Sequence, residues 1–151
     1  MKARLNAYQV APEAMKPFMA AEAYLRECGL EHSLIHLVKM RASQINGCAY
    51  CLDMHSHDAR KEGESEERLY MLNAWQESAR YTPRERAALA WTDSLTLISQ
   101  THAPDDVYAD VKAQFSDKEI ADLTLLIATI NGWNRIAIAM RTVPRSESAE
   151  A

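Results

Sequence analysis

Glycine and the other residues that build turns and strands are scarce in this sequence. Its 151 residues include four glycines and five prolines, whereas 48% of the residues are hydrophobic. Two Asn-Gly pairs occur, at residues 46–47 and 131–132. Alternating apolar residues flank neither pair, so neither predicts a β-hairpin. The near absence of strand signals favours an all-helical fold.

Cysteine is also rare. The chain has three cysteines, and residues 1–6 are not followed by an apolar run of the length found in signal peptides. An odd number of cysteines without such a run argues against a secreted disulfide scaffold, and we therefore expect a cytoplasmic protein. The closely spaced pair, Cys48 and Cys51, then requires a redox or a metal-binding role.

Long apolar runs and an excess of basic residues are missing as well. No stretch approaches the roughly 20 apolar residues that cross a bilayer, so we expect no membrane partner. There are 17 basic and 21 acidic residues, a net charge of -4, which makes nucleic acid an unexpected partner. The length suits one domain with a substantial core. We assign residues 1–144 to this domain and residues 145–151 to a polar, disordered tail.

Apolar residues recur at helical spacing along most of the chain. Capping boxes at Thr82–Glu85 and Ser116–Glu119 mark two helix starts, because each side chain satisfies a backbone N–H of the first turn. After Thr82, an apolar stripe continues as far as Ile98. The pattern predicts a compact bundle of about six to eight helices. The expected ranges include 16–28, a helix ending before 46, and 48–60, 65–75, 120–130 and 133–141.

Residues 45–57 carry the chemically reactive groups. Gly47 should end one helix, which places Cys48 at the start of the next. Free backbone N–H groups and the helix dipole can lower a thiol pKa there from about 8.5 to roughly 3.5–7.5. His55 lies four residues after Cys51 and seven after Cys48, so the three groups share a helix face. An imidazole there can take the proton of Cys51 and return one to a leaving oxygen, whereas His57 points away.

The cysteine pair could also have a structural or a metal-binding role. Buried cysteines can simply fill space. Alternatively, Cys48, Cys51 and His55 could bind zinc, with a fourth ligand drawn from His32, His36 or His57. Structural zinc cysteines usually lie on a knuckle, with the remaining ligands in a separate element, so we expect no metal. The spacing favours a redox role.

The run of residues 34–51, with the Asp53-Met54-His55 that follows it, resembles the alkylhydroperoxidase D-like proteins of the carboxymuconolactone decarboxylase superfamily. Residues 66–75, 82–89 and 131–137 share the likeness, which covers the chain from about residue 8 to 144. It implies an all-helical homo-oligomer, commonly a trimer or hexamer. It also implies thiol-dependent peroxidase or disulfide reductase activity without a metal or organic cofactor. The implied partners are a hydroperoxide and an external dithiol or lipoyl-type reductant.

The resemblance also implies roles for individual residues. Cys51 would attack the peroxide and Cys48 would resolve the sulfenic acid. The helix-dipole argument alone favours Cys48 as the more acidic thiol, whereas the His55 spacing favours Cys51, and we follow the latter. The family's proton relay usually includes a glutamate twelve residues before the first cysteine, and this chain has His36 there. His36 either relays protons through water or is a histidine bonded at a subunit contact.

Further residues and rival functions are left open by the sequence. Tyr50, Trp133 and Arg135 either border a substrate pocket or only pack their helices. One rival function is that of the superfamily's decarboxylase branch, whose members generally lack the cysteine pair. The other is a redox-sensing or partner-binding oligomer without efficient turnover.

Overall fold

The structure is a computed structural model that describes residues 2–148, and every regular element in that range is helical. The all-helical expectation is thus confirmed. More segments form than the six to eight expected, because short ones such as α1 and α7 carry no buried residue that an apolar pattern could reveal. The elements are α1 (Ala7–Val10), α2 (Pro12–Arg26), α3 (His32–Asn46), α4 (Ala49–Lys61), α5 (Glu66–Met71), the 3-10 helix η1 (Leu72–Glu77), α6 (Pro83–Thr96), α7 (Ile98–Thr101), α8 (Asp105–Gln114), α9 (Asp117–Met140) and α10 (Arg145–Ser148).

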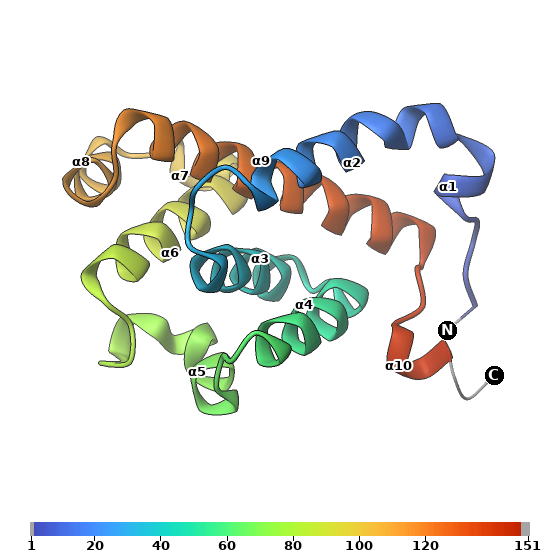
Figure 1. Ribbon diagram of the computed structural model, residues 1–151, viewed down its shortest axis with the longest axis horizontal. Helices are drawn as coiled ribbons and strands as arrows, with labels where there is room; N and C mark the ends of the chain where they lie inside the picture. Colours follow the sequence, from blue (N-terminus) through green and yellow to red (C-terminus); the bar gives the residue numbers. More distant parts are fainter. Residues whose placement is uncertain (1, 149–151) are drawn as a thin grey trace.

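Helices α3 and α4 form an antiparallel hairpin near the centre of the molecule (Figure 1). Gly47 ends α3 with φ +68°, a left-handed conformation that glycine adopts without steric cost. The N–H groups of Gly47 and Cys48 donate to the carbonyls of Gln44 and Ser43 at 3.3 and 3.0 Å. The chain therefore reverses at once, and Cys48 is the N-cap of α4, as predicted.

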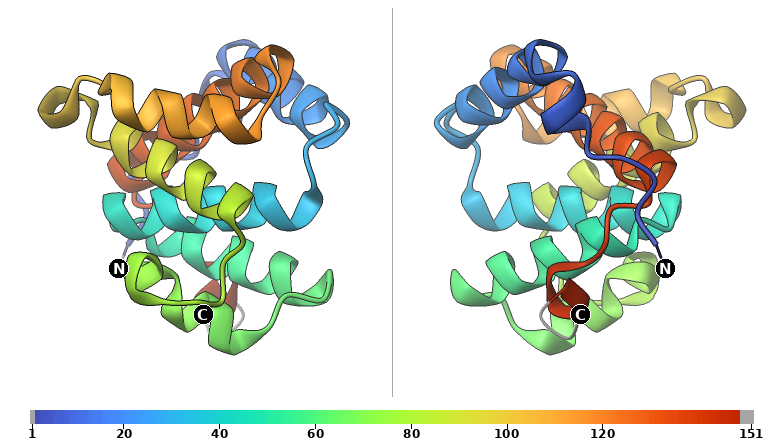
Figure 2. Two further views of the ribbon diagram at one scale, coloured as in Figure 1. Left: turned by 90° about the vertical axis from the view of Figure 1, so that its left-hand side faces the viewer. Right: turned by 90° about the vertical axis from the view of Figure 1, so that its right-hand side faces the viewer.

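Helix α3 contributes to both main parts of the core. Its side chains Leu37 and Val38 are fully buried, yet they belong to two different apolar clusters. The Val38 cluster also contains residues of α2, α6, α8 and α9, and the Leu37 cluster contains residues of α4, α5, η1 and α6. Figure 2 shows α2 and α9 on one side of α3, and α4 and α5 on the other. Burial of each such side chain contributes about 1.5–3 kcal/mol, so α3 is held from both sides.

Several predicted boundaries were wrong. The first long helix begins at Pro12, which occupies the first helical turn, and ends at Arg26. The segment expected over 65–75 is divided into α5 and η1, and η1 contains a kink at Ala74. Helix α6 ends at Thr96, so Ile98 leaves the apolar stripe and is 52% exposed in α7. Helix α8 was not predicted. Both capping boxes are present as expected.

Helix α9 is a single helix of 24 residues, where two helices were expected over 120–130 and 133–141. The Asn131-Gly132 pair does not end it. A Cβ atom added to Gly132 would lie 2.5 Å from Cε1 of Phe18 in α2, so this glycine permits the close approach of two helices. The segment Asp117–Glu147 is apolar enough to cross a membrane by length and composition alone, with a mean hydropathy of 1.2. Its burial against α2, α3 and α6 accounts for that composition.

The C-terminal tail also departs from the prediction. Residues 145–148, expected to be disordered, form α10, which packs against α4. The backbone N–H of Ser146 donates to Asp53 at 3.2 Å, which ties the segment down. Residues 149–151, the rest of the predicted tail, lie outside the described residues.

The contact between Gly132 and Phe18 predicts a coupled effect on stability. Gly132→Val should destabilise the protein by about 2 kcal/mol, because the added side chain overlaps the ring. Phe18→Ala makes room, so the double variant should lose less than the sum of the two single variants in urea unfolding. Additive losses would contradict the packing that we assign to Gly132.

Candidate active site

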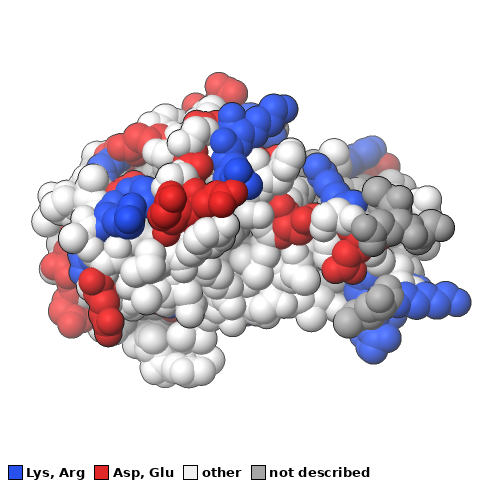
Figure 3. Space-filling model, turned by 90° about the horizontal axis from the view of Figure 1, so that it is seen from below, with Lys and Arg blue, Asp and Glu red and all other residues white. Residues whose placement is uncertain are grey.

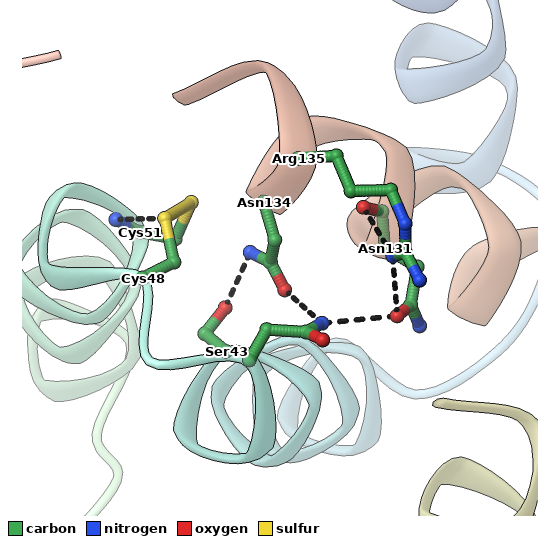
Figure 4. The surroundings of a disulfide bond; sticks show 7 residues. Ser43, Cys48, Cys51, Asn131, Asn134 and Arg135 are labelled. Atoms are coloured by element: carbon green, nitrogen blue, oxygen red, sulfur yellow. Dashed lines mark hydrogen bonds between the residues drawn. A yellow bond between two sulfur atoms is a disulfide. The ribbon is translucent and has the colours of Figure 1, made fainter. Parts of the chain in front are cut away.

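The cysteine pair lies at the turn between α3 and α4. Cys48 and Cys51 form a disulfide with their Cα atoms 5.4 Å apart, and they are 1% and 2% exposed. The backbone N–H of Cys51 donates to Sγ of Cys48 at 3.4 Å, so the sulfur of Cys48 caps the helix (Figure 4). The first turn of α4 thus directs an N–H group at this sulfur, as the helix-start argument predicted.

His55 lies one helical turn after Cys51 and is 7% exposed. The pKa of this imidazole is lowered to about 3, mainly by burial, with smaller contributions from the neighbouring Lys39, His36 and Arg145. The ring is therefore neutral near pH 7, and in this disulfide form it binds a proton only weakly. His57 is exposed, in agreement with its expected orientation away from the site.

Two ion pairs on α3 border this region. Nζ of Lys39 lies 2.6 Å from a carboxylate oxygen of Glu22 in α2, with both side chains largely buried. One turn earlier, Nε2 of His36 lies 3.1 Å from Oε2 of Glu62, the residue that caps the end of α4. Sequence reasoning proposed His36 but missed Lys39, Glu22 and Glu62. Lys39 could have been identified from its position one helical turn after His36 in the sequence.

A buried polar network anchors the cysteine turn to α9. The side-chain amide of Asn46 donates to the carbonyl oxygens of Asn131 and Asn134, both at 2.9 Å. Asn134 in turn donates to Ser43, and Asn131 donates to Thr96, both at 3.0 Å. Figure 4 shows the part of this network that includes Ser43, Asn131 and Asn134 beside the disulfide. Side-chain amides that are hydrogen-bonded to one another in this way favour one relative position of their helices. The network therefore fixes the end of α3 relative to α9. The two Asn-Gly pairs were the only sequence signal for it.

The three predicted pocket residues lie in different surroundings. Tyr50 packs against the two cysteines together with Ala137 of α9. Trp133 stacks on Tyr8 with ring centroids 6.2 Å apart, and it meets the edge of Phe18 at 5.0 Å.

Arg135 is exposed and donates to the backbone and side-chain oxygens of Asn131, at 2.9 and 3.0 Å. Tyr50 is thus the one of these three residues that the structure packs directly against the cysteine pair.

The candidate zinc ligands are engaged in other contacts. The two sulfurs are bonded to each other, and His32 and His36 both face Glu62. Within residues 2–148, no three His, Cys, Asp or Glu side chains are arranged to hold a metal ion.

The solvent side of α4 carries mixed charges. Asp53, His57, Arg60 and Lys61 line a shallow hollow there together with Ser56. Seen from below, acidic and basic side chains of the molecule are interspersed over the visible face (Figure 3). This hollow does not include either cysteine, so it is separate from the disulfide.

The low pKa of His55 predicts a pH-dependent stability in the disulfide form. The unfolded imidazole binds a proton near pH 6.5, whereas the folded one stays neutral until about pH 3, so stability falls as the pH drops through this window. Between pH 7.0 and 5.5, above the range in which most carboxylates titrate, the loss should be about 1 kcal/mol. Urea unfolding of the oxidised protein should show this slope, and His55→Gln should flatten it, whereas the exposed control His57→Gln should keep it. An unchanged slope in His55→Gln would contradict the burial of a neutral ring.

Comparison with known proteins gives the family. The model of the carboxymuconolactone decarboxylase family matches residues 11–94. The uncharacterized protein YdfG of Bacillus subtilis is 45% identical over 140 residues, which cover 93% of this chain and 95% of that protein.

Solved structures agree with this match. A protein of unknown function from Agrobacterium tumefaciens, described as a candidate antioxidant defence protein AhpD, is 48% identical with a TM-score of 0.92, covering 95% of this chain and 98% of that one. An uncharacterized peroxidase-related protein from Silicibacter sp. TM1040 is 25% identical with a TM-score of 0.82, covering 93% and 75%. The chain therefore belongs to the carboxymuconolactone decarboxylase family and has an AhpD-like fold.

Proposed function

We propose that this protein is a thiol-dependent peroxidase of the alkylhydroperoxidase D type. One observation carries the proposal: a Cys48–Cys51 disulfide forms at the start of α4, one turn before a buried, neutral His55. The description of the Agrobacterium relative as a candidate antioxidant defence protein supports it. The cycle needs a hydroperoxide and an external dithiol or lipoyl-type reductant, and no metal or organic cofactor.

The reaction begins with transfer of the Cys51 proton to His55. The thiolate attacks a hydroperoxide oxygen, an S–O bond forms, and the O–O bond breaks. The departing alkoxide takes the proton back and leaves as an alcohol. The Cys48 thiol then attacks the Cys51 sulfenic acid, which releases water and closes the disulfide. An external dithiol reduces the disulfide by two thiol–disulfide exchanges and is itself oxidised.

The helix start gives the two cysteines different tasks in this scheme. The N–H of Cys51 donates to Sγ of Cys48, so negative charge is best stabilised on Cys48. A low pKa makes a thiol a good leaving group during reduction of a disulfide. Cys48 therefore suits the role of the sulfur that leaves when the external thiol attacks Cys51. This resolves the conflict between the helix-dipole argument and the His55 spacing, because each argument applies to a different step.

Assembly and location form part of the same proposal. The side chains of Tyr8, Val10 and Met19 in α1 and α2, and of Ile138 near the end of α9, are 45–68% exposed. Exposed apolar residues of this kind suit an interface between copies. We expect a homo-oligomer, a trimer or hexamer, in the cytoplasm.

Replacement of single residues should separate these roles. Cys51→Ser should abolish peroxide reduction, because no other thiol lies one turn before His55. Cys48→Ser should allow one oxidation of Cys51 but block the disulfide and turnover. His55→Gln should slow Cys51 oxidation by about 100-fold, since a positioned base typically contributes that much. Cys28→Ser is the control and should retain activity. Cys28 is partly buried, and its thiol donates a hydrogen bond to the backbone carbonyl of Leu25.

Stopped-flow oxidation with several hydroperoxides, followed by mass mapping of the cysteines, checks these outcomes. Full activity in Cys51→Ser would contradict the assignment.

Burial of both sulfurs favours one alternative function, a redox switch that closes its disulfide but turns over slowly. A stable disulfide with negligible peroxide turnover for every dithiol tested would establish it.

A further inference from the structure

His36 occupies the position at which the resemblance implies a relay carboxylate. One nitrogen of its ring has a hydrogen-bond partner, and the other has none among the described residues. Nε2 lies 3.1 Å from the Glu62 carboxylate, so the proton of a neutral ring belongs on Nε2, where it can be donated. Nδ1 is then an acceptor. It is buried and has no hydrogen-bond partner among the described residues.

The two imidazoles belong to the two helices of the α3–α4 hairpin. Helices α3 and α4 run in opposite directions, so the end of α4 with Glu62 lies beside the start of α3 with His36. His55, further back along α4, is buried and close enough to His36 for the two rings to influence each other electrostatically. A buried acceptor without a partner costs about 1–3 kcal/mol unless water reaches it. Nδ1 therefore needs a water or another hydrogen-bond donor.

We propose that Glu62 and His36 together replace the single relay carboxylate. Glu62 holds His36 in the Nε2–H tautomer, and Nδ1 of His36 accepts, through water, the proton that His55 removes from Cys51. This inference rests on the proposed peroxidase function. Glu62 and His36 are positioning residues, because both act on the sulfur through His55.

The proton and charge balance of this relay is simple. Arrival of the proton converts the His36–Glu62 hydrogen bond into an ion pair of imidazolium and carboxylate. The hydrogen bond from His36 lowers the pKa of Glu62 below its ordinary value, so the carboxylate is ionised when the proton arrives. The proton returns through His55 to the alkoxide oxygen when the O–O bond of the hydroperoxide breaks.

Other charges around the two rings make a carboxylate necessary. Lys39 from α3 and Arg145 from α10 both oppose a positive charge on His55, and Glu22 from α2 is already paired with Lys39. His32 also approaches Glu62, at 3.4 Å, from the exposed start of α3. Glu62 is thus the carboxylate in direct contact with His36 that can compensate a proton there.

A double-substitution cycle on the reduced full-length protein tests the relay. Glu62→Gln should slow oxidation of Cys51 by hydrogen peroxide about tenfold, as expected if the base weakens by about one pKa unit. In a His36→Glu background the new carboxylate serves directly, so Glu62→Gln should cause little slowing. In a His36→Gln background, which has no relay nitrogen, Glu62→Gln should have no effect. Glu67→Gln in α5 is the matched control and should react like the native protein.

The pH profile distinguishes a relay from a structural role. The rate of Cys51 alkylation by iodoacetamide, followed by mass mapping, should have its acid limb moved up by about one pH unit in Glu62→Gln. A structural role would lower the melting temperature equally in all backgrounds and leave that limb in place. Unchanged rates in Glu62→Gln, or equal slowing in the native and His36→Glu backgrounds, would overturn the proposal.

The two proposals fail in different ways. Alkylation needs no peroxide, so it reports the relay even where turnover is absent. If the cycle behaves as expected in alkylation but peroxide is not turned over, the relay stands and the peroxidase function fails. If peroxide is turned over but the cycle shows no dependence on background, the relay alone fails.

Discussion

The left-handed turn at Gly47 is the constraint on which the rest of the site depends. It ends α3, reverses the chain and makes Cys48 the N-cap of α4. The same reversal brings the end of α4 back to the start of α3, where Glu62 meets His36. A side chain at residue 47 would strain this conformation by roughly 1–2 kcal/mol. One backbone conformation therefore positions both the sulfurs at one end of the hairpin and the charged pair at the other.

Burial and charge act together on His55. An imidazole taken out of water and placed near Lys39 and Arg145 loses its ability to hold a proton, and in the disulfide form no thiolate is present to compensate. Reduction changes this balance, because a thiolate on Cys51 would favour the imidazolium. The proton affinity of His55 is thus coupled to the redox state of the pair, and closing of the disulfide favours release of the proton.

Short-range features of the site could be predicted from the sequence, and long-range ones could not. The N-cap position of Cys48 and the shared face of Cys51 and His55 follow from spacing along one helix. Glu62 was missed because its contact with His36 depends on how two helices pack, which no local pattern records. The Asn46–Asn131–Asn134 network was missed for the same reason. The pattern predicts two helices on either side of residues 131–132, whereas the structure has the single helix α9 with Gly132 inside it. The role of Gly132, contact with Phe18, is visible only when α2 is in place.

The presence of His36 at the position where the resemblance implies an acidic residue has a physical consequence for the proposed relay. A carboxylate at that position would carry its charge into the buried hairpin and would have to be desolvated there. With His36 in place, the charge stays on Glu62, whose side chain is 48% exposed, while the buried atom is a neutral nitrogen. The cost of burying an ion is avoided in the resting state, and positive charge appears next to the carboxylate only when a proton moves. The two residues are therefore expected to substitute for the glutamate only as a pair, since either one alone supplies half of its function.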